Sequence, residues 1–475
     1  MRPVQLLQLV FSALLAASVA HAHDMVHEAL AGPHRLTVYL NPHAVTTGIV
    51  EVAARAESGG VADMRFALTN VDASPGEPAF ATATALPVEG DPTLFRSSLA
   101  IPSQATWRVD IQAAGESGSG GFSIPVAAAA PFGGLAKGIV RLAAIGAWVL
   151  FTAFVLVALR WLWAGPSRGR RRLLPVSAAV ASPWLLLGLS NGVLESVFYH
   201  PAVYQRAYQT VAIHPSVSAD GVLDLELTDP GLVKFRRFDD LVLDHGHPMH
   251  MYALRLPELD RVFHLHPEEL QPGVFSRELP DMPAGRYQLV ADIVHSTGLW
   301  EAPQGELELG AAIRADGVFQ HDDSGGGGHG ISEARFDRNS FGLSDGHRMI
   351  WEKPGRALRA GDPLRLNFRL EDSEGRLAPD IELYMGMLGH SVILRHDRSS
   401  FAHVHPTGSV SMASIKALSD SPADGAHHHH RMPDLEAKVA FPYAFPEAGR
   451  YRLIVQMKHG GRVDTGFFDA EVARR

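Results

Sequence analysis

The stretch GHPMHMYALRLPELDRVFHLHP, residues 246–267, decides the fold of the C-terminal half of the chain. In an extended strand His250 and Tyr252 point to the same face, because side chains alternate. A Pro-Glu-Leu-Asp turn at 257–260 separates this strand from a second one that ends in HLHP, a pattern typical of a β-hairpin. Folding the chain about the turn brings His266 within about one residue of His250, close to the roughly 5 Å of cross-strand neighbours. We therefore expect the hairpin to gather histidines at its open end.

The pattern is repeated later in the chain. MLGHSVILRHDRSSFAHVHP, residues 387–406, has the same order of strand, turn and HxHP motif. Each copy is followed by a closing strand, PAGRYQLVADIVH at 283–295 and PEAGRYRLIVQMKH at 446–459. An internal repeat of this size is expected to encode one structural unit per copy.

Short alternating runs separated by Gly and Pro clusters predict a β-sandwich in each of three regions. These are residues 23–128, the first repeat at 205–310 and the second repeat at 346–475. Between the repeats, 311–345 contains the run SGGGGHG at 324–330, which predicts a flexible linker. The expected fold class is mainly β, with three Ig-like sandwiches.

Two apolar segments predict membrane helices between the first and second sandwich. Residues 138–163 and 173–194 are long enough to cross a bilayer, and the Arg-rich loop 164–172 between them predicts a cytoplasmic side. Residues 1–22 have the pattern of a signal peptide, with an uncleaved anchor as the alternative. This topology predicts an inner-membrane protein whose sandwiches face the periplasm, the alternative for the two segments being a buried hairpin of soluble helices.

Composition excludes several classes of chemistry. The 475 residues include 42 Lys and Arg against 51 Asp and Glu, a net charge of −9 that gives no sign of a nucleic-acid partner. Cysteine is absent, which excludes disulfide scaffolds, thiolate metal sites and Cys nucleophiles. Histidine, by contrast, occurs 25 times, so imidazole is the surplus metal ligand.

Several of these histidines occupy matching places in the two repeats. The equivalent positions are His250 with His390, His264 with His403, His266 with His405, and His295 with His459. Two or three imidazoles converging at a sheet rim predict a site for a divalent metal ion. The alternative is that each histidine only hydrogen-bonds a loop carbonyl at a strand end.

Neighbouring residues favour copper, with zinc as the alternative. Methionines stand beside His250 and before His390, and thioether with imidazole suits copper better than calcium or magnesium. Cleavage after residue 22 would leave His23 as an amino-terminal chelator with His27 nearby. The four-histidine run at 427–430 predicts a metal-buffering loop, or else a polar insertion that is rich in histidine.

The opening HRLTVYLNPH and the strand TWRVDIQA of the N-terminal domain resemble YtkA-like and FixH-like β-sandwich domains, which occur in bacterial envelope proteins linked to metal handling or oxidase assembly. The His23 start also looks like that of CopC-type periplasmic copper carriers, although the spacing after it differs. The H…HxHP…GRY repeats are similar to those of bacterial copper-associated envelope proteins. This resemblance implies an envelope location and a bound copper ion, and it does not imply any particular reaction.

These observations predict a membrane-anchored envelope protein that binds a transition metal, most simply copper, in a homeostasis, carrier or assembly role. Its expected partners are the lipid bilayer, the metal ion and a copper transporter or oxidase-assembly protein. One alternative is a structural or interaction module of Ig-like repeats in which the histidines are incidental. A metallohydrolase or oxidase is a third hypothesis, against which the sequence contains no HExxH, GxSxG or paired-carboxylate motif. We therefore do not expect an enzyme.

Overall fold

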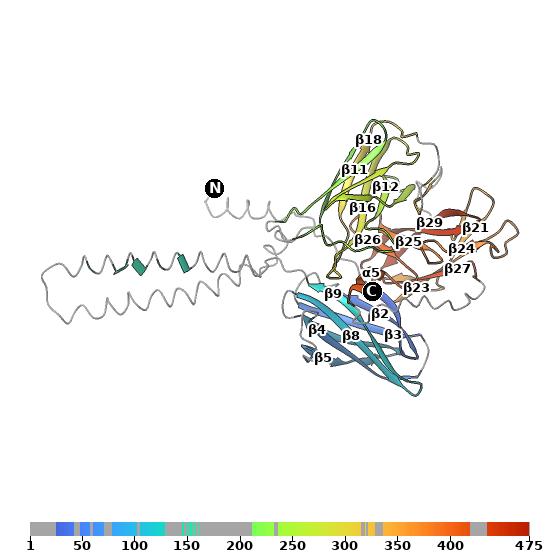
Figure 1. Cartoon of the computed structure of the whole chain (residues 1–475). Coiled ribbons are helices and arrows are strands. Elements are labelled where there is room, and N and C mark those ends of the chain that lie inside the picture. Colours follow the sequence, from blue (N-terminus) through green and yellow to red (C-terminus); the bar gives the residue numbers. More distant parts are fainter. Residues whose placement is uncertain are drawn as a thin grey trace, which may run out of the picture. The chain divides into compact units, whose positions relative to one another are not determined.

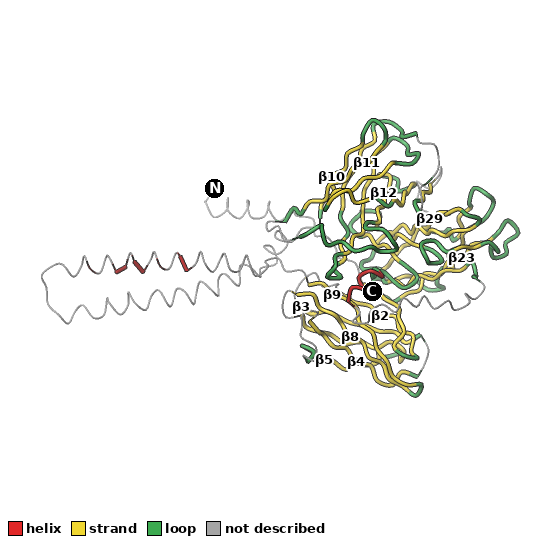
Figure 2. Tube along the Cα trace, in the orientation of Figure 1, coloured by secondary structure: helices red, strands yellow, loops and turns green. Residues whose placement is uncertain are grey.

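The computed structural model is mainly β, with 61% of the described residues in strands and 4% in helices, which confirms the predicted β class (Figure 1). Figure 2 shows the predominance of strands in the part of the chain that is described. The described residues are 25–128 without 42–47, 58–59, 71–77 and 102–104; isolated positions between 145 and 160; 211–327 without 232–235, 315–318 and 320–321; 336–418; and 435–474.

The prediction of two transmembrane helices is wrong for the structure as described. No helix among these residues is long and apolar enough to cross a membrane. The prediction rested on apolar length, which is necessary for a span but is not sufficient evidence of one. Segments 1–22, 164–172 and 173–194 lie outside the described residues, as does 138–163 apart from isolated positions.

The N-terminal domain is a sandwich of two antiparallel sheets, with strand orders β1-β2-β3-β7-β6 and β5-β4-β8-β9. Its strands are β1 Met25–Ala31, β2 His34–Asn41, β3 Gly48–Ala56, β4 Val61–Asn70, β5 Ala81–Thr84, β6 Leu86–Val88, β7 Asp91–Ile101, β8 Ala105–Gly115 and β9 Gly118–Ala128. Alternation puts Val38, Phe66 and Trp107 into one buried core between the sheets. The predicted β-sandwich is confirmed here.

The first repeat forms one sheet of ten strands, ordered β14-β15-β11-β10-β18-β16-β12-β13-β19, with β17 paired to β16. The strands are β10 Ala212–Val217, β11 Val222–Thr228, β12 His250–Leu256, β13 Arg261–Leu265, β14 Glu268–Gln271, β15 Val274–Glu278, β16 Gly285–Val294, β17 Trp300–Glu301, β18 Gln304–Leu309 and β19 Ser324–Gly327. Leu225 and Phe275 from one half of this sheet share a core with Met251 and Leu289 from the other. The sheet therefore encloses its own core like a sandwich.

The second repeat has sheets β20-β21-β23-β27 and β22-β29-β28-β25-β26, with β24 paired to β28. Its elements are β20 Ser340–Gly342, β21 Arg348–Glu352, β22 Leu358–Arg359, β23 Leu364–Glu371, β24 Ile381–Glu382, β25 His390–Arg395, β26 Phe401–Val404, α5 Met412–Leu418, β27 Lys438–Tyr443, β28 Gly449–His459 and β29 Arg462–Ala473. Trp351, Phe441 and Leu453 lie in its core.

The two repeats pack against each other through the hairpins that carry the HxHP motifs. Tyr252 and Leu254 on β12 share a buried cluster with Val392 and Leu394 on β25, the equivalent strand. On β12, Met251 and its alternate neighbours face the repeat's own core instead. Each of these strands is thus buried on both faces, and the face that begins with the histidine is the one that meets the other repeat.

The segment 311–345 differs from the linker that its glycines predict. Ser324–Gly327 forms β19, which pairs with β13, and Ser340–Gly342 forms β20. A Cβ on Gly326 would lie 2.3 Å from Cβ of Thr465, so a larger residue has no room there. Glycine is needed for close packing between the repeats, and Ser324–Gly327 is part of the sheet of the first repeat.

The loop after His405 is held by the N-terminal domain. The backbone N–H of Glu28 donates to the carbonyl of Thr407 at 2.7 Å, and that of Ser409 donates to the carbonyl of Val26 at 2.8 Å. Val410 inserts into the N-terminal core. These contacts fix the backbone next to one of the predicted metal ligands.

Candidate metal centre

The register of each hairpin brings the predicted histidines together. β12 pairs with β13 so that Tyr252 lies opposite His264, which puts His250 opposite His266. β25 pairs with β26 in the same way, and His390 comes to lie opposite His405. The hairpin prediction is confirmed in both repeats. We call His250, His264 and His266 the first histidine site, and His390, His403 and His405 the second histidine site.

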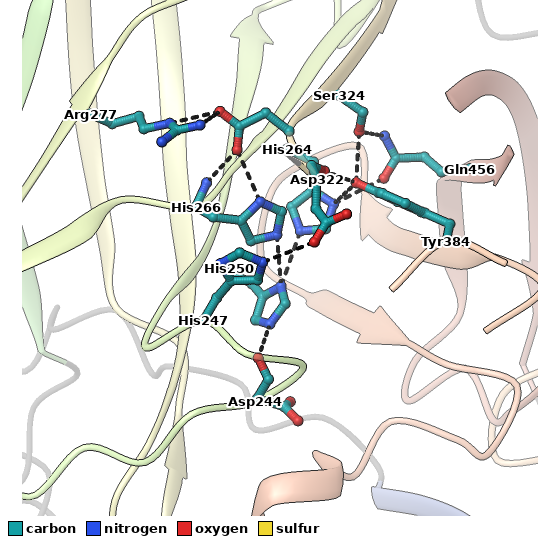
Figure 3. Close-up of polar contacts among 11 residues, drawn as sticks. Asp244, His247, His250, His264, His266, Arg277, Asp322, Ser324, Tyr384 and Gln456 are labelled. Carbon is teal, nitrogen blue, oxygen red and sulfur yellow. Dashed lines mark hydrogen bonds and ion pairs between the residues drawn. The ribbon is translucent and has the colours of Figure 1, made fainter. Parts of the chain in front are cut away.

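Three ring nitrogens converge in the first histidine site (Figure 3). Nδ1 of His250 lies 3.3 Å from Nε2 of His264 and 3.2 Å from Nε2 of His266. Two ligand atoms on a tetrahedral ion are about 3.3 Å apart when the metal–nitrogen bonds are about 2.0–2.1 Å. Both of these spacings fit imidazoles on one ion, and all three ligand atoms lie within 4.8 Å of one another. Three imidazoles would leave a fourth position for another ligand.

Surrounding acceptors fix the protonation of two of these rings. Nε2 of His250 lies 3.0 Å from the backbone carbonyl oxygen of Asp244, which can only accept, so the proton of this ring is on Nε2. Nδ1 of His266 donates to Oδ1 of Asp323 at 3.0 Å, and Arg277 holds the other oxygen of that carboxylate. Both rings consequently turn an unprotonated nitrogen toward the site.

The third ring is fixed from the other repeat. Nδ1 of His264 lies 3.2 Å from Oε1 of Gln456, whose Nε2 donates to Oγ of Ser324. It also lies 3.1 Å from the hydroxyl of Tyr384, which itself donates to the carbonyl of Asp322. The proton of His264 is thus assigned to Nδ1, and its Nε2 also carries a lone pair. Three lone pairs then face one point, an arrangement that a cation stabilises.

The second histidine site repeats this arrangement with one difference. Nδ1 of His390 lies 3.2 Å from Nε2 of His403, and Nε2 of His390 donates to the carbonyl of Tyr384. Nδ1 of His403 donates to Oδ2 of Asp292 at 2.7 Å. His405 is 2% exposed, and no described residue hydrogen-bonds either of its ring nitrogens. A buried imidazole without partners is costly, and a metal ion would satisfy it.

Burial keeps most of these rings in the form that binds metal. Desolvation, and after it the positive charge of neighbouring histidines, lowers the pKa of five ligands well below the usual value: His250, His264, His266, His390 and His405. Neutral imidazole is the metal-binding form, so no proton has to leave these rings at neutral pH.

The two sites adjoin each other across the interface between the repeats. The ring centroids of His264 and His403 are 5.8 Å apart, and those of His250 and His403 are 5.7 Å apart. Asp292 and Gln456, which orient His403 and His264, occupy equivalent positions, opposite His250 and His390 respectively. Each repeat therefore supplies the residue that orients a ligand of the other, and neither site is complete in one repeat.

Two further histidines, which the sequence reasoning did not select, lie against these sites. The ring of His247 stacks on His266 at 4.1 Å and its Nε2 lies 3.2 Å from Asp322. His245 contacts His250 and His405, at 5.9 and 5.1 Å between ring centroids. Their place in the run DHGH, directly before the strand of His250, was the available signal.

The structure separates His295 and His459 from the two histidine sites. His295 lies between Asp240 and Glu301, at 2.8 and 3.1 Å. Burial lowers the pKa of His295, but its hydrogen bonds to Glu301 and Asp240 more than offset this, and the net pKa is raised. That is the behaviour of an imidazolium paired with carboxylates.

His459 has a comparable environment at the end of β28. Its Nε2 lies 2.6 Å from Oδ2 of Asp464, and its ring lies 4.4 Å from that of His347. Ligand atoms of His459, His347 and Asp345 lie close enough together to hold an ion. Arg462, however, pairs with Asp345 at 2.6 Å and with Asp464 at 3.0 Å, so its guanidinium already balances the charge of these carboxylates.

The remaining predicted ligands do not join the centre. His27 is buried beside Phe122, and burial lowers its pKa to about 4. Met251 and Met249 lie in the core of the first repeat, whereas His250 faces the other repeat. His23 and the run 427–430 lie outside the described residues. The ligands that the structure gathers are therefore all imidazole nitrogens.

One family model matches the region of the second repeat. The model of the family Domain of unknown function (DUF8832) matches residues 343–474. No curated protein matches the sequence. The resemblance of the N-terminal domain to YtkA-like and FixH-like domains stays a prediction.

Solved structures that resemble the chain include Salmonella alpha-2-macroglobulin reacted with methylamine, at 8% identity and a TM-score of 0.21, and native Escherichia coli alpha-2-macroglobulin, at 9% and 0.21. Each match covers 94% of this chain, and 24% and 23% of those proteins. The chain thus spans about a quarter of their length. Three N-terminal domains of the bacteriophage RB49 Highly Immunogenic Outer Capsid protein (Hoc) match at 8% identity and a TM-score of 0.15, over 95% of this chain and 99% of that three-domain chain. Scores this low carry no argument about function.

Proposed function

We propose that this chain binds one transition-metal ion at each histidine site and serves in metal storage or transfer. The observation that carries the proposal is the convergence of unprotonated nitrogens in buried three-histidine groups, with His405 lacking any hydrogen-bond partner among the described residues. An incidental set of strand-end histidines would direct its lone pairs and protons toward loop groups. Here the outer nitrogens of the other five rings are hydrogen-bonded to surrounding groups, and the inner nitrogens face each other.

Copper is the metal that we propose, with zinc as the alternative. The ligand atoms are imidazole nitrogens, which suit both ions, and affinity for nitrogen sites is highest for Cu(II) in the divalent series. Of the methionines that favoured copper in the sequence, Met249 and Met251 pack in the core and lend no support. The preference therefore rests on the nitrogen donor set.

We propose binding without catalysis because the ligands are closed off from solvent. All six histidines of the two sites are at most 3% exposed. A catalytic metal needs an open position that a substrate can reach. An extracytoplasmic location is part of the proposal and rests on the leader pattern of residues 1–22. The proposed partner, a copper transporter or an oxidase-assembly protein, rests on the resemblance to envelope proteins linked to metal handling.

Equilibrium dialysis of the full chain against Cu(II), and separately Zn(II), tests the proposal. The background should carry Ser at His427, His428, His429 and His430, so that this run does not contribute. We expect two ions per chain in the background, one in His250→Ala or His390→Ala, and none in the double variant.

His214→Ala is the matched control, because this exposed histidine on β10 contacts Thr228 and lies outside both sites. It should keep two ions. If the double variant still binds two ions, and its thermal unfolding shows that it is folded, the proposal is overturned.

A further inference from the structure

The two histidine sites differ in the charge that lies behind their ligands. In the first site, the carboxylate of Asp323 behind His266 is neutralised by Arg277, at 2.8 and 2.6 Å. In the second, the carboxylate of Asp292 behind His403 has no Lys or Arg partner among the described residues. Asp292 is 7% exposed, and its Oδ1 is buried without a hydrogen bond. The second site therefore has a buried negative charge that is not compensated by a fixed cation.

The residue at the equivalent position in the other repeat is neutral. Gln456 orients His264 in the first site through an amide oxygen at 3.2 Å, where Asp292 orients His403 through a carboxylate at 2.7 Å. A carboxylate behind a ligating imidazole makes the ring a stronger donor and attracts the metal ion directly. In a buried setting this charge interaction is only weakly screened.

We propose that the two sites fill in order, the second histidine site before the first, as an unequal pair set by Asp292 and Gln456. This inference rests on the proposed function. The site with the uncompensated carboxylate gains more from a dication, because the ion replaces the missing countercharge. Once it is filled, its charge disfavours an ion in the first site, whose rings lie 5.7 to 6.3 Å from those of the second. The first site would then hold the more readily released ion.

Crystals of the full chain grown with one equivalent of Zn(II) test the order, because anomalous diffraction at the zinc edge locates the ion. We expect zinc at His390, His403 and His405 in the unmodified chain. In the double variant Asp292→Asn with Gln456→Glu, which moves the carboxylate from one site to the other, the ion should lie at His250, His264 and His266.

The single variant Asp292→Asn should weaken zinc binding at the tighter site, raising the smaller of the two dissociation constants by about 10–100-fold. Asp380→Asn is the control, because it removes a carboxylate beside His459 and away from both sites, and it should change neither constant. Equal occupancy of the two sites at one equivalent, or zinc at the first site in the unmodified chain, would overturn the order. Absence of zinc at both sites would instead overturn the proposed function.

Discussion

Nδ1 of His403 in the second repeat lies 2.7 Å from Oδ2 of Asp292 in the first, so a predicted metal ligand of one repeat is oriented by a residue of the other. The contact has a counterpart in His264 and Gln456. The candidate centre thus belongs to the interface between the repeats, and its properties should depend on residues of both.

Replacing His405 by Leu should remove metal binding from the second site without destabilising the metal-free protein. His405 is buried with no hydrogen-bond partner among the described residues, and an apolar side chain of similar size removes that desolvation cost. We expect the metal-free free energy of unfolding to be unchanged or raised by about 1 kcal/mol. Denaturant unfolding with and without chelator measures it. A loss of more than about 2 kcal/mol would mean that His405 already has a structural partner.

Metal loading should stabilise the chain against heat. Binding to the folded state alone adds about 2.7 kcal/mol per site when the free ion is at 100 times its dissociation constant. The midpoint temperature of thermal unfolding should therefore rise when Cu(II) is added and return to its metal-free value when a chelator is added. His250→Ala with His390→Ala should abolish the shift, and His214→Ala should keep it. An equal shift in the double variant would assign the effect to other ligands.

The stabilising effect of His295 should decline as the pH rises. Its folded pKa is raised above the ordinary value of about 6.5 by Glu301 and Asp240. A raised folded pKa means that the contribution is fully present below the unfolded pKa and is lost as the pH passes the folded pKa. His295→Gln should therefore destabilise the protein more at pH 5.5 than at pH 9. Urea unfolding at the two pH values measures this difference, and a pH-independent effect would contradict the ion-pair assignment.

Gly326→Ala should destabilise the contact between the repeats. The added Cβ would lie 2.3 Å from Cβ of Thr465, and overpacking of this kind costs about 1–3 kcal/mol. Gly342→Ala is the matched control, because it is also a strand glycine and its Cβ would meet nothing within 4 Å. Chemical unfolding measures the free energy of unfolding of the two variants. Because β19 also carries Ser324, which holds Gln456, the first site should bind metal more weakly in Gly326→Ala.

The hairpins and their histidine pairs could be predicted because alternation and a short turn fix local register. His250 opposite His266 and His390 opposite His405 follow from those two features alone. The separation of His295 depends instead on the pairing of β12 with β16, which no short turn fixes. Asp292 lies opposite His250, so His295 is three residues further along and points to the other face of its strand.

The packing between the repeats could not be predicted from the local pattern. Tyr252 and Leu254 alternate with Met251 and Ala253, so both faces of β12 are apolar, and the sequence does not say which face meets its own core. The contacts of Gln456 with His264 and of Asp292 with His403 join residues 192 and 111 positions apart. Pairings at that separation depend on tertiary packing, as does the pairing of β19 with β13.

X-ray absorption at the copper edge shows directly whether histidine nitrogens of the two sites bind the ion. The sample is the full chain loaded with two equivalents of Cu(II) in the background that carries Ser at 427–430. We expect a first shell dominated by nitrogen at about 2.0 Å, with the scattering of about three imidazole rings per ion. The imidazole scattering should be smaller in the double variant His250→Ala with His390→Ala. A shell dominated by oxygen, or a spectrum that this double variant leaves unchanged, would contradict it.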